Sequence, residues 1–376
     1  MATFSMQFTP MTFGVGSSAL VGKKLKELGC TRVMFIYDPA MGQFGHADTI
    51  KKYLKEEELP FAEYSGVTGE TTVSMVEEAA AIAREFGADG VLGFGGGSTL
   101  DLAKHIGLML KKPGSVIQDF IALNNKKKHD YSCPTVLMPT TSGTSSEVTM
   151  GSIVADPESG IKTGSVKRSG NFALVDPVYT LDLPPRVTAF TTLDMLAHVT
   201  ESYIGPITNW MSDFFCEKVI ELVFKYLPIA VKDGKNLEAR TQLSYACVMA
   251  GYAFWNNPTN VGHAVADMLS LYYHYPHGVG CSIGLPITVR YAIKTNPQKV
   301  ERIAEILGLE DKSGCAVLKA YQNLIKEVGM QTLKETGIDQ ADVEKIAAEM
   351  LTTFRFRDQP LDKQAAVDAL HEDFNS

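Results

Sequence analysis

Two kinds of segment alternate along the first half of the chain. Short apolar runs at residues 32–38 and 90–94 have the length and composition of buried parallel strands, and residues 61–64 form another strand-like piece. Segments with helical periodicity separate such runs, at residues 17–28, 47–57 and 72–86. Strands that alternate with helices in this way predict a doubly wound α/β domain.

The pattern changes after Leu183-Pro184-Pro185, where strand-like runs nearly vanish and helical periodicity dominates. We therefore expect two domains, an α/β domain over residues 1–180 and an all-α domain over residues 181–376. The expected helices of the second domain cover residues 189–204, 211–232, 236–255, 260–272, 280–292, 297–307, 314–328, 331–336, 339–353 and 361–373.

Length and composition agree with two ordinary globular domains. The 376 residues are many for one core, and the net charge of −8 argues against nucleic acid or an anionic membrane as the main partner. The start of the sequence has no basic region or long apolar run, and no stretch of 18 apolar residues exists, so we expect neither a signal peptide nor a membrane span. Six scattered cysteines without a CxxC pair favour a reduced, cytoplasmic protein.

A glycine run follows the strand-like residues 90–94. Gly95-Gly96-Gly97 stands between a strand and a helix, where backbone N–H groups and the helix N-terminus can approach a pyrophosphate. The run is not GxGxxG, and a simple tight turn is the alternative. Asp38 ends an earlier strand and could accept a hydrogen bond from a ribose hydroxyl, or could equally be a helix N-cap or a loop residue.

A second polar loop follows the apolar residues 134–139. Residues 140–146 are all Ser, Thr or Gly, so they offer hydroxyl and backbone donors to a phosphate or amide, or form a simple connector. Lys162 stands on what could be a hairpin, where it could reach a cofactor or be exposed.

The candidate metal ligands lie in the helical half. Asp194 and His198 are four residues apart, which on a helix puts both side chains on one face. His263 and His277 follow fourteen residues apart. One carboxylate and three imidazoles suit Fe(II) or Zn(II), whereas ordinary surface or core residues are the alternative.

Together these motifs resemble those of the iron-containing (group III) alcohol dehydrogenases, in order and spacing, from about residue 13 to about residue 360. The matching pieces are Gly95-Gly96-Gly97-Ser98 with Asp101 and Lys104, residues 139–149, Leu174-Val175-Asp176-Pro177, the Asp194/His198 turn and Pro276-His277-Gly278.

The resemblance implies a dehydroquinate synthase-like two-domain architecture, with a Rossmann-like dinucleotide-binding domain and a helical domain. It implies NAD as cofactor, Fe(II) or sometimes Zn(II) in the cleft between the domains, and a homodimer or higher homo-oligomer. The implied metal ligands are Asp194, His198, His263 and His277. The implied cofactor contacts are Asp38, Gly95, Gly96, Gly97, Ser98, Asp101, Thr140, Thr141, Thr144, Thr149, Lys162 and Leu181.

Three positions depart from the family pattern and bear on which alcohol is used. Trp255 stands where the family often has Asn, and residues 69–72 replace a usual Asn-Pro. Asp267, four residues after His263, stands where the family usually has a histidine. It could orient a metal ligand, bind a polar substrate or pass a proton outward together with His274, or it could face solvent. The polar residues near Asp267 in the sequence favour a short or functionalised aldehyde as the substrate.

The implied reaction is hydride transfer between a primary alcohol and NAD(H), with the metal acting as a Lewis acid on the substrate oxygen. A carboxylate at Asp38 would repel the 2′-phosphate of NADP(H). The alternatives are a glycerol-dehydrogenase-like polyol dehydrogenase, a dehydroquinate-synthase-like lyase and a non-catalytic nucleotide-binding module.

Overall fold

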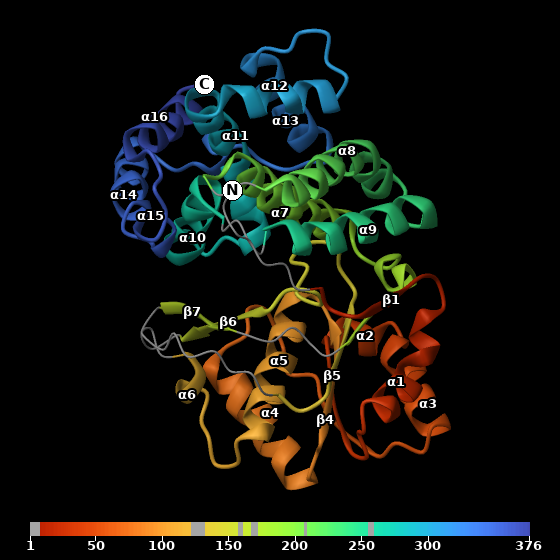
Figure 1. The fold of residues 1–376 in the computed structure, drawn as a ribbon. Helices are drawn as coiled ribbons and strands as arrows, with labels where there is room; N and C mark the ends of the chain where they lie inside the picture. The colour runs from red at the N-terminus through yellow and green to blue at the C-terminus, as the bar shows by residue number, and fades with distance from the viewer. Residues whose placement is uncertain (1–7, 122–131, 157–160, 167–171, 207–208, 255–258) are drawn as a thin grey trace. The chain divides into compact units, whose positions relative to one another are not determined.

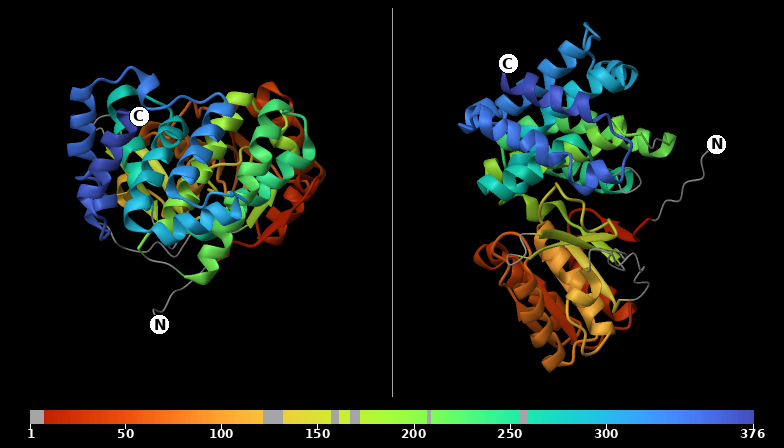
Figure 2. Two further views of the ribbon diagram at one scale, coloured as in Figure 1. Left: turned by 90° about the horizontal axis from the view of Figure 1, so that it is seen from above. Right: turned by 90° about the vertical axis from the view of Figure 1, so that its left-hand side faces the viewer.

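The computed structural model describes residues 8–376 except 122–131, 157–160, 167–171, 207–208 and 255–258. The described chain divides into two compact units, Phe8–Asp182 and Leu183–Ser376. Figure 1 and Figure 2 show the helices and strands of each unit. Each unit also buries its own hydrophobic residues, in two clusters in the first unit and one in the second.

The first unit is built on a six-stranded sheet in the order β1-β8-β5-β4-β2-β3, in which every pair of neighbours is parallel. A two-stranded antiparallel hairpin, β6-β7, accompanies it. The strands are β1 (Met11–Phe13), β2 (Val33–Tyr37), β3 (Phe61–Tyr64), β4 (Gly90–Gly95), β5 (Thr135–Pro139), β6 (Gly151–Asp156), β7 (Ile161–Val166) and β8 (Phe172–Val175).

Helices cover both faces of this sheet. Along β2, Val33 and Phe35 pack into one core with α1 and α3, whereas Met34 and Ile36 pack into the other with α4 and α5. This burial on both faces explains the continuous apolar runs in the sequence. The helices are α1 (Val21–Glu27), α2 (Pro39–Gln43), α3 (His46–Glu56), α4 (Val73–Phe86), α5 (Gly97–Lys111) and α6 (Gln118–Ile121), with 3₁₀ turns η1 (Ser17–Leu20) and η2 (Pro177–Thr180).

Local signals place both ends of α4. Thr72 caps α4 by accepting a hydrogen bond from the Met75 N–H, and Gly87 ends the helix at a φ of 71°. The expected doubly wound α/β unit is confirmed. The strand predicted at residues 61–64 is β3, whereas the short strands β1 and β8 were not predicted.

The second unit is entirely helical where it is described. Its elements are α7 (Pro185–Ile204), α8 (Trp210–Lys232), α9 (Leu237–Phe254), α10 (Val261–Tyr273), α11 (His277–Thr295), α12 (Pro297–Ile306), α13 (Gly314–Glu327), η3 (Lys334–Thr336), α14 (Gln340–Met350), α15 (Phe354–Arg357) and α16 (Lys363–Phe374). Helix α11 packs against α7, α10, α13 and α16, which explains why it is apolar on nearly all sides. None of the described helices has the length and hydropathy that crossing a bilayer would need.

Two details of the predicted helices were wrong. The segment predicted at 331–336 forms only the 3₁₀ turn Lys334–Thr336. The helix predicted at 339–353 ends at Met350, and a separate short helix, α15, begins at Phe354. Thr353 lies between them in extended conformation, which breaks the helix although the apolar periodicity continues.

Glycines let α10 and α11 cross very closely. A Cβ built on Gly284 would lie 2.4 Å from the Gly262 carbonyl oxygen, and one built on Gly262 would lie 2.8 Å from the Gly284 carbonyl oxygen. Neither position accepts a side chain without moving a helix backbone. His263 directly follows Gly262 in α10, so this contact also fixes the backbone position of His263.

Candidate active site

Helix α7 supplies Asp194 and His198 on one face, as their spacing predicted. Asp194 is only 3% exposed, and its Oδ1 lies 3.5 Å from Nδ1 of His198. The His198 ring stacks on Phe254 with the ring centroids 4.3 Å apart, which holds the imidazole in one orientation.

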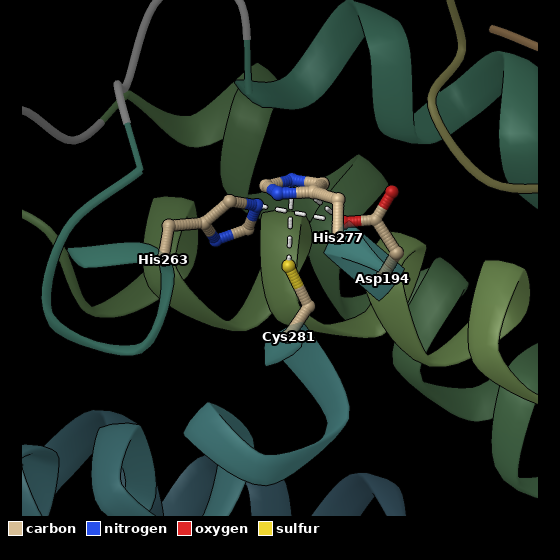
Figure 3. A group of neighbouring side chains, drawn as sticks. All are labelled: Asp194, His263, His277 and Cys281. Carbon is tan, nitrogen blue, oxygen red and sulfur yellow. Dashed lines mark hydrogen bonds and ion pairs between the residues drawn. The ribbon is translucent and has the colours of Figure 1, made fainter. Parts of the chain in front are cut away.

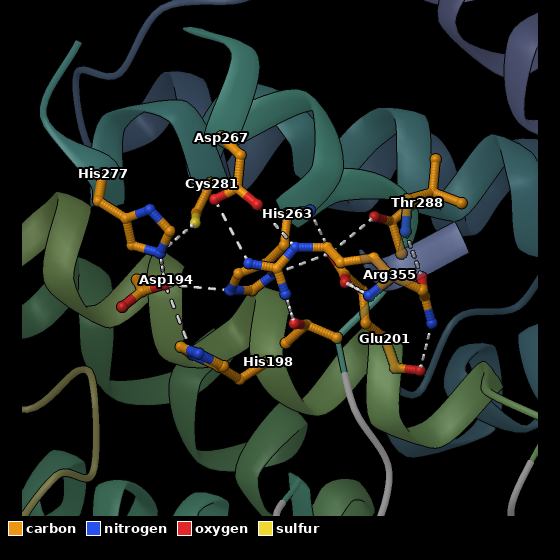
Figure 4. Close-up of polar contacts among 12 residues, drawn as sticks. Asp194, His198, Glu201, His263, Asp267, His277, Cys281, Thr288 and Arg355 are labelled. Carbon is orange, nitrogen blue, oxygen red and sulfur yellow. Dashed lines mark hydrogen bonds and ion pairs between the residues drawn. The ribbon is translucent and has the colours of Figure 1, made fainter. Parts of the chain in front are cut away.

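Two further imidazoles converge on the same oxygen. His263 near the start of α10 places Nε2 3.5 Å from Asp194 Oδ1. His277, the first residue of α11, places Nε2 3.8 Å from that oxygen. Three helices thus bring together all four residues predicted as metal ligands, as Figure 4 shows.

The donor set fits a metal ion. Asp194 Oδ1, His198 Nδ1 and His263 Nε2 are all buried and have no hydrogen-bond partner among the described residues. Buried polar atoms rarely remain unpaired in a folded protein. Ligand atoms that each lie about 2.1 Å from one ion in a tetrahedral site are about 3.4 Å apart. The three separations between Asp194 Oδ1 and the imidazole nitrogens, 3.5, 3.5 and 3.8 Å, are close to this value.

The electrostatics favour a cation at this point. Burial works against the ionised form of Asp194, but the surrounding imidazoles outweigh it and hold its pKa well below the usual range. Burial lowers the pKa of His198 to about 4, so this ring is neutral at pH 7. Burial also opposes charge on His263, yet the nearby Cys281, Glu201 and Asp194 raise its pKa. The centre therefore combines an anionic carboxylate with imidazoles in an environment that attracts positive charge.

Glu201 is a functional candidate that the sequence did not reveal. This carboxylate is completely buried, and its Oε1 lies 3.0 Å from His263 Nδ1 and accepts a hydrogen bond from the His263 backbone N–H. Its Oε2 accepts from the backbone N–H of Asn260. A carboxylate bonded to one ring nitrogen fixes the tautomer and leaves the other nitrogen available as a ligand. Glu201 lies seven residues after Asp194, two helical turns along the same face of α7, and this spacing is the signal that could have found it.

Cys281 is the second residue that the sequence reading missed. It is completely buried in α11, one turn after His277, and its Sγ lies 3.5 Å from His277 Nε2. One donor atom each from Asp194, His263, His277 and Cys281 lies within 4.8 Å of all the others. Figure 3 shows the sulfur pointing into this group. The i,i+4 spacing from His277 was available in the sequence.

Asp267 lies one helical turn after His263, but its carboxylate is held by Arg355. Asp267 Oδ2 accepts from Arg355 Nε at 2.8 Å, and Oδ1 accepts from Nη2 at 3.3 Å. Arg355 also donates to the Thr259 hydroxyl. Burial raises the pKa of Asp267, but the Arg355 charge outweighs it and lowers the pKa. His274 is exposed at the end of α10, with φ at 56°. Trp255, Asn256 and Asn257 lie outside the described residues.

The predicted cofactor residues gather at the carboxyl edge of the sheet in the first unit. Asp38 follows β2, and Gly95 to Ser98 link β4 to α5. Strands β2 and β4 are neighbours in the sheet. The chain continues from β2 to β3 in one direction across the sheet, and from β4 to β5 in the opposite direction. Connections that diverge in this way mark the crevice where doubly wound folds bind ligands.

Close packing requires glycine at two positions of the run. A Cβ on Gly95 would lie 2.7 Å from the Thr99 side chain, and one on Gly97 would lie 2.6 Å from the Thr144 side chain. Gly96 caps α5 without a side-chain bond, so the helix N-terminus is presented directly at this edge. Asp38 caps α2 by accepting from the Ala40 N–H, which is the structural role considered as its alternative.

The remaining predicted cofactor residues lie along the loop after β5 and on neighbouring elements. Thr140 and Thr149 are buried, and Thr141 approaches Gly96. Leu181 ends η2. Lys162 lies in β7 opposite Ala155, and its side chain is outside the described part of the structure.

Asp101 has a structural task at this edge. Its Oδ1 accepts from the Ser146 hydroxyl, and its Oδ2 accepts from the Ile153 N–H at 2.8 Å. The buried Lys104 ammonium lies 3.6 Å from Asp101 and donates to the Gly151 carbonyl at 2.7 Å. This network ties the loop and the hairpin to α5.

Comparison with known proteins gives the family. Residues 9–177 match the family described as iron-containing alcohol dehydrogenase, and residues 188–371 match the C-terminal domain of the Fe-containing alcohol dehydrogenase family. The chain belongs to the iron-containing alcohol dehydrogenase family. The predicted family and fold class, and an oxidoreductase activity on an alcohol or aldehyde, are thereby confirmed.

Individual relatives span nearly the whole chain. A sulfoacetaldehyde reductase of Bilophila wadsworthia is 30% identical over 88% of this chain and 87% of its own length. An NAD-dependent methanol dehydrogenase of Bacillus methanolicus is 28% identical over 90% of this chain and 91% of its own. A crystal structure of a 1,3-propanediol oxidoreductase matches with a TM-score of 0.92 at 27% identity, covering 99% of this chain and all of its own.

Proposed function

We propose that this protein is an NAD(H)-dependent, metal-containing alcohol dehydrogenase that interconverts a short or functionalised aldehyde and its primary alcohol. Asp194, His198, His263 and His277 hold the metal. The observation that carries the proposal is the convergence of the three imidazoles on Asp194 Oδ1, at 3.5, 3.5 and 3.8 Å. Unpaired buried donor atoms at this point support a resident cation.

The chemistry divides between the metal and the protein. Fe(II) or Zn(II), when bound, supplies Lewis-acid polarisation of the substrate oxygen. Asp194 contributes negative charge, and the stacked His198 ring contributes a fixed neutral donor. Glu201 holds the tautomer of His263. The bond of Asp267 to Arg355 supports a role in positioning α10, which was not among the roles predicted for this residue, since the carboxylate is already engaged.

Glu201→Gln is expected to weaken metal binding by about 10- to 100-fold, the usual effect of changing the partner of a metal-ligating histidine. The amide keeps the size of the side chain but cannot accept all the donors that now face the carboxylate. Metal titration of the purified variant measures the effect. Glu217→Gln is a suitable control because Glu217 bonds to Tyr203 and Arg302 in the same helical unit. Equal affinities in all three proteins would contradict the role of Glu201.

NAD(H) is the proposed cofactor. It is supported by the glycine run at the N-terminus of α5, by the diverging connections after β2 and β4, and by the NAD-dependent relative. Asp38 directly follows β2 at this edge, where its carboxylate can accept from a ribose 2′-hydroxyl and would repel a 2′-phosphate.

Asp38→Asn is expected to narrow the preference for NAD(H) over NADP(H). Two unit charges about 4 Å apart repel by roughly 1 kcal/mol in water and about 4 kcal/mol at an effective dielectric near 20, so the preference should fall by about fivefold or more. Asn caps a helix as well as Asp does, so α2 should be preserved. The ratio of kcat/KM for the two cofactors is the measurement. A wild-type enzyme that uses both equally would refute the assignment.

An aldehyde panel tests the function itself. Protein loaded with Fe(II) without oxygen, and separately with Zn(II), is assayed for NADH oxidation with short aliphatic, hydroxylated and anionic aldehydes. We expect metal-dependent turnover with at least one short aldehyde. Turnover confined to polyols would favour the glycerol-dehydrogenase-like alternative, and no net change in NADH with any redox substrate would overturn the proposal. A homodimer and a cytoplasmic location stay predictions from the sequence.

A further inference from the structure

Cys281 was not among the predicted metal ligands, but it lies beside three of them. Its thiol is completely buried and one helical turn from His277, so both side chains project from the same face of α11. The Sγ atom lies 3.5 Å from His277 Nε2 and, with Asp194 and His263, completes a group of donors that are all within 4.8 Å of one another (Figure 3).

We propose that Cys281 is a metal ligand of this centre, and that its sulfur shifts the metal preference of the site towards Zn(II) and away from Fe(II). The inference rests on the proposed function, because it concerns the same ion. Coordination forms a metal–sulfur bond, breaks the S–H bond and releases the proton to solvent.

Two observations independent of the cysteine point to an ion within its reach. Asp194 Oδ1 and His263 Nε2 are buried atoms without a hydrogen-bond partner in the described structure, and both residues belong to the compact group that includes Cys281. Asp194 and His263 are 3% and 1% exposed, so water does not solvate them. A cation that satisfies these two atoms lies beside the sulfur.

Cys281 belongs to the compact donor group, whereas His198 does not. His198 Nδ1 lies 3.5 Å from Asp194 Oδ1 but is not part of the compact set that contains Sγ. The centre therefore offers a shared core of Asp194, His263 and His277 with one additional donor from α7 and another from α11. Zn(II) accepts four or five ligands of mixed N, O and S type, and a thiolate is a softer donor than imidazole or carboxylate. This donor chemistry favours Zn(II) over Fe(II).

X-ray absorption of the Zn(II)-loaded wild-type protein tests the proposal without any substitution. We expect a sulfur scatterer at about 2.3 Å in addition to nitrogen and oxygen at about 2.0–2.2 Å. The Co(II)-loaded protein should show a thiolate-to-metal charge-transfer band. Both signals should disappear in Cys281→Ser and persist in Cys216→Ser, which removes another completely buried thiol of the same unit, in α8.

Metal selectivity gives a second measurement. In a competition between Zn(II) and Fe(II), the ratio of Zn(II) affinity to Fe(II) affinity should be at least about tenfold lower for Cys281→Ser than for the wild-type protein. Tenfold is the lower end of the usual effect of a substitution at a metal site. Bound metal with nitrogen and oxygen scatterers only would overturn the ligand role of Cys281 while leaving the proposed function intact. Wild-type protein that binds no metal at all would instead overturn the metal centre, and this inference with it.

Discussion

Asp194→Asn should remove most of the bound metal and lower turnover at least about a thousandfold. The three imidazoles converge on Oδ1 of this side chain, and Asp194 is the only carboxylate among the four proposed ligands. Two unit charges about 4 Å apart interact by roughly 4 kcal/mol at an effective dielectric near 20. Removing the carboxylate charge therefore costs about three orders of magnitude in affinity for each unit of charge on the metal. Asn has nearly the same shape, so the loss reports charge rather than packing.

Metal analysis after dialysis, together with NADH-linked turnover, measures this effect. Asp373→Asn is the matched control, since Asp373 is a buried carboxylate in the same unit that pairs with Arg290 at 3.0 Å. The control is expected to lose stability but to keep its metal, because its ion pair joins α11 to α16 outside the donor group. Full metal occupancy and normal turnover in Asp194→Asn would refute the metal centre.

Local features of the sequence predicted much of the fold. The i,i+4 pair Asp194 and His198 could be recognised because one helical turn brings those side chains together whatever the rest of the chain does. The strands β2 and β4 could be recognised because burial on both faces makes a continuous apolar run. The architecture followed from how these elements alternate.

The surroundings of the centre depend on contacts between residues far apart in sequence. Arg355 meets Asp267 from 88 residues away, and Glu201 meets His263 from 62 residues away. No periodicity encodes such pairs, because each depends on how α7, α10 and the segment around α15 pack. The role of Asp267 was open for this reason, since no local pattern indicates a guanidinium beside it.

Convergence of the histidines depends on how closely α10 and α11 approach each other. Gly262 immediately precedes His263, and Gly284 lies two helical turns after His277 in α11. The two glycine backbones touch, so the helices can approach this closely only because neither position carries a side chain. The sequence alone does not show the role of these glycines, because a glycine within a helical pattern can have several structural roles.

Gly284→Ala is therefore expected to be strongly destabilising and to weaken metal binding. The added methyl group would lie 2.4 Å from the Gly262 carbonyl oxygen and 2.8 Å from its Cα, so a backbone must move rather than a flexible side chain. Overpacking of this kind costs about 1–3 kcal/mol, occasionally more, and we expect the upper end. For a unit of this size that corresponds to a fall in Tm of roughly 6–12 °C. The displacement of α10 carries His263 with it, so metal affinity should fall as well.

Gly280→Ala is the matched control on the same helix. Its methyl group would lie 3.0 Å from the Cα and 3.1 Å from the Cβ of Ala266, so a shift of a few tenths of an ångström relieves the contact. We expect a clearly smaller fall in Tm and metal affinity close to that of the wild-type protein. Thermal unfolding of metal-free protein separates the packing effect from the loss of the ion, and metal titration measures the displacement of His263. If Gly284→Ala unfolded at the wild-type temperature and bound metal normally, the helix contact would not be what positions His263.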